Sequence, residues 1–179
     1  MKKMICFHAL AIVVMATAAQ AQTANPLSAG AKRTYEITKG YLTRAAEKMP
    51  AENYAFKPTP DVRSFGQLVG HVADASFGFC SAVAGEKPPM GGFDGSLEKS
   101  KTSKADLQKA LADAFAYCDK VYASVTDSGG TAMVKGFWGE LPKLSVLDFN
   151  TAHNFEHYGN IVTYMRLKNI VPPSSEPRK

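Results

Sequence analysis

Four segments of the chain repeat apolar residues at steps of three and four, and no segment sustains the alternation of a strand. The segments span 26–49, 64–84, 103–125 and 145–169. In the second segment, the apolar stripe consists of Phe65, Leu68, Val72, Ala75, Phe79 and Val83. Amphipathic helices of roughly 20 residues bury such stripes by packing against one another. The sequence therefore predicts an all-α four-helix bundle.

The predicted helix ends carry start and stop signals. Ser64, with Gln67 three residues later, forms a capping box at the start of the second segment. Gly85 follows the same segment and is expected to end the helix.

Two long links, 86–102 and 131–143, show no helical periodicity. Links of this length usually carry function or cross between distant helix ends. The second link holds Phe137 and Trp138, and we expect these rings to anchor it on the bundle.

The first 21 residues have the layout of a secretory signal. Two lysines precede an apolar run over 9–19, and Ala-Gln-Ala at 19–21 fits a cleavage site. The run is shorter than the about 20 residues that a membrane-spanning helix needs. We therefore expect cleavage before Gln22, a secreted or periplasmic protein, and no stable membrane anchor once the signal is removed.

The remaining chain has 179 − 21 = 158 residues, enough for one domain with a single core. We expect the bundle to span 22–171 and the Pro/Ser-containing tail, 172–179, to be disordered. Removing the two signal lysines takes the formal net charge from +5 to +3, and no Lys/Arg run remains. The sequence therefore predicts no nucleic-acid binding.

Outside the signal, the chain contains three histidines: His71, His153 and His157. His153 and His157 lie four residues apart, so they project from one helix face about 40° apart and can ligate one ion. His71 lies at the edge of the second stripe, and a bundle core can bring a third ligand from another helix. The pattern predicts a divalent metal site, and imidazole suits both Zn²⁺ and Ni²⁺.

Other polar residues of the fourth segment accompany the histidines. Asn150 and Asn160 share their predicted face and can orient ligands, while Glu156 and Tyr164 are candidate catalytic residues for proton transfer. Two alternatives remain open. One is a set of hydrogen-bonded core histidines without metal. The other is a zinc protease, because His-Asn-Phe-Glu-His matches H-x-x-E-H, although no acidic residue follows it outside the tail.

Two stretches, SFGQLVGHVADASFGFCSAVAGEKPP and LSVLDFNTAHNFEHYGNIVTYMRLKNIVPP, resemble the DinB-like family of four-helix bundles. The resemblance lies in the order of one histidine in the second helix followed by two in the fourth. It implies that His71, His153 and His157 form the metal-binding triad of that family. It also implies an up-down-down-up bundle with a crossover between the second and third helices.

The family is similar to thiol-dependent transferases and isomerases, in which a bound divalent ion activates a thiol or water. The resemblance therefore implies an exported metal-dependent enzyme with hydrolase- or thiol-transferase-like chemistry on a small molecule. The alternative is a non-catalytic metal-binding or scavenging module that holds a structural ion.

Cys80 and Cys118 lie at similar distances from the starts of the second and third segments. In parallel helices both sulfurs would sit about 23 Å from the helix starts, whereas antiparallel helices would offset them by more than about 10 Å. The long 86–102 link favours parallel helices. Export permits a disulfide, and two buried free thiols are the alternative.

A second apolar row lies roughly opposite the histidines on the fourth segment. It consists of Leu147, Thr151, Phe155 and Val162. A helix that is apolar on two faces needs two partners, and the second partner is either another copy of the chain or one of the long links. We favour a two-fold homodimer, because such dimers are the commonest oligomers.

Overall fold

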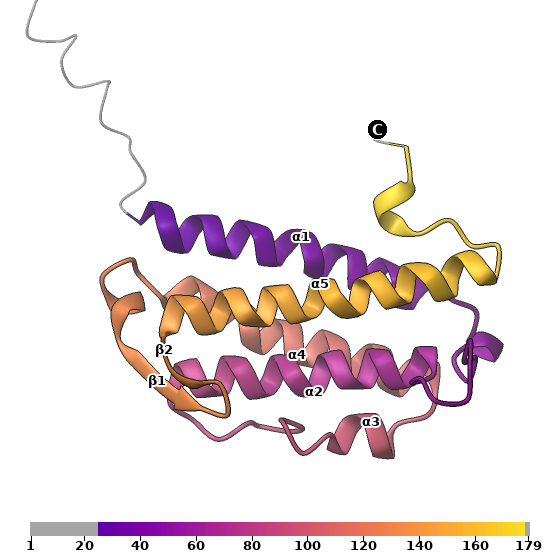
Figure 1. Ribbon diagram of the computed structural model, residues 1–179, viewed down its shortest axis with the longest axis horizontal. Coiled ribbons are helices and arrows are strands. Elements are labelled where there is room, and N and C mark those ends of the chain that lie inside the picture. Colours follow the sequence, from indigo (N-terminus) through magenta and orange to yellow (C-terminus); the bar gives the residue numbers. More distant parts are fainter. Residues whose placement is uncertain (1–24, 178–179) are drawn as a thin grey trace, which may run out of the picture.

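The computed structural model describes residues 25–177, in which four long helices pack into a bundle (Figure 1). These helices are α1 (Pro26–Lys48), α2 (Phe65–Ala84), α4 (Lys104–Ser124) and α5 (Lys143–Leu167). The predicted all-α fold is confirmed, and each helix begins and ends within two residues of its expected bounds. The expected signal, 1–21, lies outside the described residues.

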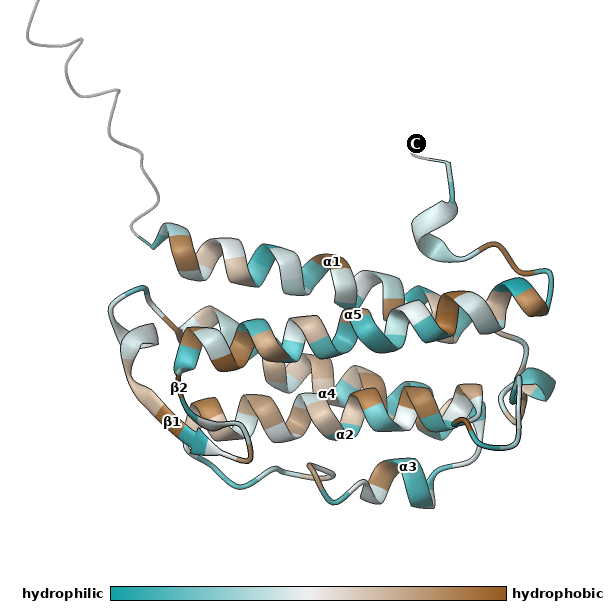
Figure 2. Ribbon diagram, viewed as in Figure 1, coloured by the Kyte–Doolittle hydropathy of each residue, from teal (hydrophilic) through white to brown (hydrophobic). Residues whose placement is uncertain are grey.

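Helix α2 is the most deeply buried of the four, with 16 of its 20 residues buried. Apolar residues recur along it (Figure 2). The Ser64 hydroxyl accepts from the Gln67 backbone N–H at 3.2 Å, and the Gln67 side chain accepts from the Ser64 N–H at 2.9 Å. Gly85 ends the helix in the left-handed conformation, at φ 76°. The capping box and the glycine stop are both confirmed, so local sequence sets both ends of the central helix.

Helices α2 and α4 run side by side in the same direction (Figure 1). Near their starts, Gly66 lies against the Leu107 side chain, and one or two turns from their ends Cys80 meets Cys118. Parallel neighbours require the chain to return along the length of the bundle between them. The link between α2 and α4 does so, running along the outside of α2 (Figure 1).

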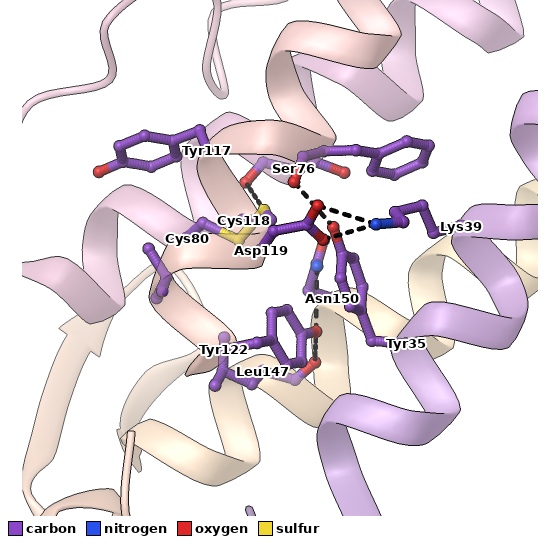
Figure 3. Close-up of a disulfide and its surroundings, with 12 residues drawn as sticks. Tyr35, Lys39, Ser76, Cys80, Tyr117, Cys118, Asp119, Tyr122, Leu147 and Asn150 are labelled. Carbon is purple, nitrogen blue, oxygen red and sulfur yellow. Dashed lines mark hydrogen bonds and ion pairs between the residues drawn. A yellow bond between two sulfur atoms is a disulfide. The ribbon is translucent and has the colours of Figure 1, made fainter. Parts of the chain in front are cut away.

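A disulfide between Cys80 and Cys118 joins α2 to α4, with a Cα–Cα distance of 5.4 Å (Figure 3). Both residues are fully buried. Beside them, the Tyr35 ring from α1 stacks on Tyr122 from α4, with centroids 4.0 Å apart. The Tyr35 hydroxyl donates to the Phe115 carbonyl at 3.1 Å. Of the two sequence-based alternatives for the cysteines, the structure contains the disulfide.

Both long links contain secondary structure that the sequence did not predict. A short helix, α3 (Ser96–Ser100), lies in the first link. In the second link, β1 (Met133–Gly136) and β2 (Gly139–Pro142) form an antiparallel hairpin whose two-residue loop is Phe137-Trp138. The expectation that the chain has no strands was wrong. Strands of four residues are too short to show a period of two.

The inward face of α5 is rotated from its predicted position. Asn150 and Asn154 are completely buried, whereas Asn160 is exposed and Phe149 is 39% exposed. The sequence predicted that Asn150 and Asn160 share the inward face of the histidines, and His153 itself is only half-buried. Helix α5 contacts both α1 and α2, so its buried face points between them rather than toward α2 alone.

Part of the second apolar row on α5 is covered within the chain. Leu147 and Thr151 are buried, and the Tyr122 hydroxyl on α4 lies 3.0 Å from the Thr151 hydroxyl. Phe155 remains 38% exposed, and Val162 is half-buried. The contacts of this row are therefore partly internal to the bundle, and the homodimer stays a prediction.

The C-terminal segment is more ordered than its composition indicated. Residues 172–177, expected to be disordered, include a 3₁₀ turn at Pro173–Ser175. The Tyr158 hydroxyl donates to the Ser174 side chain at 2.9 Å and holds this turn on α5. Among the helices of residues 25–177, none combines the length and apolar character needed to cross a membrane.

Candidate metal centre

Helices α2 and α5 bring the three predicted histidines together. The Nε2 atom of His153 lies 3.2 Å from that of His71 and 3.0 Å from that of His157. One nitrogen from each ring lies within 4.8 Å of the other two. His71 and His153 are half-buried, and His157 is buried. Because α2 packs against α5, one residue of α2 can face two successive turns of α5.

The spacing of the nitrogens fits the coordination shell of a metal ion. Zn–N bonds of about 2.0–2.1 Å in a tetrahedron separate neighbouring ligands by about 3.3 Å. The two shorter separations in the cluster, 3.0 and 3.2 Å, are close to that value. His153 Nε2 lies within hydrogen-bond distance of Nε2 in both other rings, and a single ring proton can bridge only one of these two pairs. A cation at their centre satisfies all three nitrogens at once.

The electrostatic environment keeps the rings neutral, as metal ligation requires. Burial, with the other rings of the cluster nearby, lowers the pKa of His153 and of His157 to about 4. Burial also lowers the pKa of His71, against an opposing effect of the nearby Glu98 carboxylate. At neutral pH all three rings therefore present a lone pair.

A carboxylate from the α2–α4 link supports His71. Glu98 on α3 places Oε2 3.2 Å from His71 Nδ1, and its Oε1 accepts from Arg63 Nε at 2.9 Å. A carboxylate on the far nitrogen of a ligating histidine fixes the tautomer and orientation of the ring. The His71 ring is thereby held with Nε2 toward the other two histidines.

Two residues of α2 hold Glu98 in place. The Asp74 carboxylate accepts from the backbone N–H groups of Leu97 and Glu98, at 3.1 and 2.8 Å. Gly70 permits close approach, because a Cβ there would lie 2.8 Å from the Glu98 Cα. Sequence reasoning missed Glu98. The only signal that pointed toward it was the length of the link that carries it.

The asparagines predicted to orient ligands have different surroundings. Asn160 Nδ2 lies 3.4 Å from His157 Nδ1, and the amide supports Nε2 ligation when it is turned so that Oδ1 accepts from Nδ1–H. Asn150 instead donates to the Tyr122 hydroxyl at 3.2 Å, in the core beside the disulfide (Figure 3). The expected role of Asn150 beside the histidines is therefore not supported. His153 Nδ1 is buried and has no hydrogen-bond partner among the described residues.

The two candidate catalytic residues also differ. Glu156 is exposed and lies at the rim of the hollow that contains His71 and His153. The Tyr164 hydroxyl donates to the Arg63 carbonyl at 2.7 Å and so ties the 49–64 link to α5. Burial raises the pKa of Tyr164. The structure thus gives Tyr164 a bonded structural position and leaves Glu156 accessible to a ligand.

A cleft of about 420 Å³ opens on one side of the histidines. Its lining includes His71, His153, Glu98 and Glu156. This volume is in the range of pockets that hold small ligands. The arrangement combines three neutral nitrogen ligands with space for a small molecule beside them.

Solved structures with the same fold include a DinB-like protein from Bacillus cereus, which matches with a TM-score of 0.69 and 15% identity over 80% of this chain and 94% of that one. A DinB-like protein from Bacillus subtilis matches with a TM-score of 0.65 and 17% identity, over 84% and 99% of the two chains. A mycothiol-dependent maleylpyruvate isomerase matches with a TM-score of 0.63 and 12% identity over 75% of this chain. The match covers only 60% of the isomerase.

No curated protein sequence matches the chain significantly. Residues 34–161, most of the described bundle, match the DinB superfamily. This match and the shared fold agree with the order of the histidines along the chain, and the protein belongs to the DinB superfamily.

Proposed function

We propose that this protein is an exported, divalent-metal-dependent enzyme that acts on a small molecule. The observation that carries the proposal is the convergence of His71, His153 and His157 beside an open cleft. A Zn²⁺ or Ni²⁺ ion bound there supplies Lewis acidity and lowers the pKa of a water or thiol that it holds.

The residues around the triad have separate tasks in this proposal. Glu98 orients the His71 ring through Nδ1, and the Asn160 amide, with its oxygen turned toward Nδ1, orients His157. Glu156, accessible at the rim of the cleft, accepts a proton from the water or thiol nucleophile. We assign no proton transfer to Tyr164, because its hydroxyl already donates to the Arg63 carbonyl.

An open site supports an enzyme over a scavenging module. Among the described residues, no other His, Cys, Asp or Glu joins the three-histidine cluster. Three protein ligands leave coordination positions for water or substrate, as catalytic sites do, whereas structural sites are closed by a fourth. The cleft gives a small molecule access to these positions.

Elemental analysis of the purified protein tests the metal site, and we expect one ion per chain. The His153→Ala protein should lose at least about 100-fold in metal affinity, because even residues that only support a ligand are worth about 10–100-fold. Glu156→Gln is the matched variant: it should keep the ion and lose turnover. A wild-type protein without metal, or a His153→Ala protein with unchanged affinity, would overturn the proposal.

The open coordination position has its own test. Co²⁺ in place of the native ion gives visible absorption that depends on its ligands. Added azide should shift this spectrum if a position is free. An unchanged spectrum at saturating azide would favour the structural-ion alternative.

Export is part of the proposal. It is supported by the signal-like first 21 residues and by the Cys80–Cys118 disulfide, since disulfides persist in oxidising compartments. Mass spectrometry of the protein from its native host should find a chain that begins at Gln22 and contains no free thiol. An uncut, reduced chain in the cytosol would contradict export.

A further inference from the structure

Five aromatic residues form a continuous surface beside the three histidines, which we call the aromatic wall. They come from α2, the α2–α4 link, the hairpin loop and α5. The wall consists of Phe79, Phe93, Phe137, Trp138 and Phe149. Four segments far apart in the sequence therefore each contribute at least one ring to the same place.

Phe79 is the centre of the aromatic wall and its connection to the histidines. It is 1% exposed, and its ring centroid lies 5.1 Å from that of Phe93 and 5.5 Å from that of Trp138. The Phe149 centroid lies 5.2 Å away and that of His153 lies 5.8 Å away. A ligand that touches the wall is therefore adjacent to the proposed metal ligands.

Three rings of the wall are unusually accessible. Phe137 is 70% exposed, Phe93 is 52% exposed and Phe149 is 39% exposed. Phe93, Phe137 and Phe149 all line the 420 Å³ cleft. Contiguous exposed apolar surface next to polar groups is typical of a ligand-binding site.

The backbone is shaped to hold these rings. A Cβ on Gly136 would lie 2.5 Å from the Trp138 ring, and a Cβ on Gly78 would lie 2.8 Å from the Phe93 ring. Gly139 has φ 88°, which side chains with a Cβ rarely adopt, directly after the Phe137-Trp138 loop. Glycine thus appears where a ring of the wall lies directly on the backbone or where the hairpin turns.

The cleft also has charged lining residues, and its cations are already engaged. Arg63 pairs with Glu98 at 2.9 Å, and Lys99 Nζ donates to the Asp94 carbonyl at 2.6 Å. The acidic residues of the cleft are Asp74, Asp94, Glu98 and Glu156. Neither cation is free to pair with an anionic distal group of a ligand, so this lining disfavours such a ligand.

We infer that the aromatic wall binds an uncharged aromatic group of the substrate, while the reactive polar group of that substrate faces the three histidines. This inference rests on the proposed function and deepens it by naming the substrate class. The ligand class is a small aromatic compound with one metal-binding or metal-activated group. Phe149 contacts its ring from the bundle, Phe93 and Phe137 contact it from the two links, and the buried Phe79 supports these rings from behind.

The test compares two hydroxamic acids with the metal-loaded protein by isothermal titration calorimetry. Both bind metal through the same group, but benzohydroxamic acid carries a phenyl ring where acetohydroxamic acid carries a methyl group. We expect benzohydroxamic acid to bind about tenfold more tightly, from the larger apolar surface that it buries. Equal affinities would overturn the inference while leaving the metal site intact.

Two single substitutions test whether the preference for the phenyl compound comes from the aromatic wall. Phe137→Ser removes a 70% exposed ring at the hairpin tip and should reduce the preference for the phenyl compound by about threefold. Phe155→Ser is the matched control, since Phe155 is 38% exposed on α5 and does not line the cleft. A loss of preference in the control, or none in Phe137→Ser, would contradict the assignment.

An experiment on the metal-free protein distinguishes a failure of the aromatic-wall inference from a failure of the metal proposal. Phenol should show saturation transfer from the metal-free protein by NMR, and Phe137→Ser should weaken it. If phenol binds but benzohydroxamic acid binds no more tightly after metal is added, the metal proposal fails and the aromatic wall stands. If Phe137→Ser instead converts a dimer into a monomer in sedimentation experiments, the wall is an interface between copies and the inference is wrong.

Discussion

Helix α2 presents a closed interface to α4 and an open one to α5. Toward α4, the Cys80–Cys118 disulfide lies fully buried beside stacked tyrosines. Toward α5, His71 and His153 are only half-buried and face a cleft. The difference shows how one helix can be held rigidly on one side while polar side chains on its other side stay accessible to solvent and ligand. We expect the closed interface to determine stability and the open one to determine binding.

Removing the disulfide should lower stability with little effect on binding. The Cys80→Ala/Cys118→Ala protein should lose about 2–4 kcal/mol in its free energy of unfolding, because the disulfide closes a loop in the unfolded chain. Urea denaturation of oxidised wild-type and variant proteins measures this loss. Metal affinity should change little. If it fell in parallel, the two interfaces of α2 would act as one unit.

Replacing Glu98 should lower metal affinity and leave stability nearly unchanged, the reverse of removing the disulfide. We expect Glu98→Gln to lower metal affinity about 10–100-fold, because His71 loses the carboxylate that orients its ring. Competition with a chelator of known affinity measures the change. Glu140→Gln, on an exposed strand of the hairpin, is the control. A Glu98→Gln protein that binds metal as tightly as wild type would show that His71 needs no such support.

The last prediction is a pH dependence of the metal-free protein. His153 and His157 have a pKa of about 4 when folded, below the ordinary value of 6.5. Between pH 6.5 and pH 4 the unfolded chain therefore binds protons that the folded chain does not, and stability falls as pH falls. Thermal unfolding should show a larger loss over this window for wild type than for His153→Gln/His157→Gln. Equal losses would show that these rings are not held neutral by the fold.

The sequence predicted the features that depend on local spacing. The capping box at Ser64 and Gln67 needs only neighbouring residues, and the four-residue step between His153 and His157 puts both on one face in any helix. The meeting of His71 with that pair depended on recognising the order of histidines in the family. The four helices followed from periodicity, because each stripe is long enough to show its period.

The features that the sequence did not predict depend on contacts between residues that are far apart in the chain. Glu98 reaches His71 only because Asp74 and Gly70 seat α3 against α2, and nothing near Glu98 in the sequence indicates this. Asn154 is buried because α5 packs between two helices, which a single helical projection cannot show. The hairpin was missed because each of its strands has four residues.

The hairpin has a consequence for observing the protein in solution. Trp138 is the only tryptophan in the chain, and its ring lies beside Phe79 in the aromatic wall. Intrinsic tryptophan fluorescence therefore reports on the surroundings of the aromatic wall and on no other part of the chain. A bound paramagnetic ion, a ligand ring or a movement of the hairpin alters the surroundings of this one indole. The fluorescence of Trp138 can therefore monitor ligand binding at the aromatic wall without an added label.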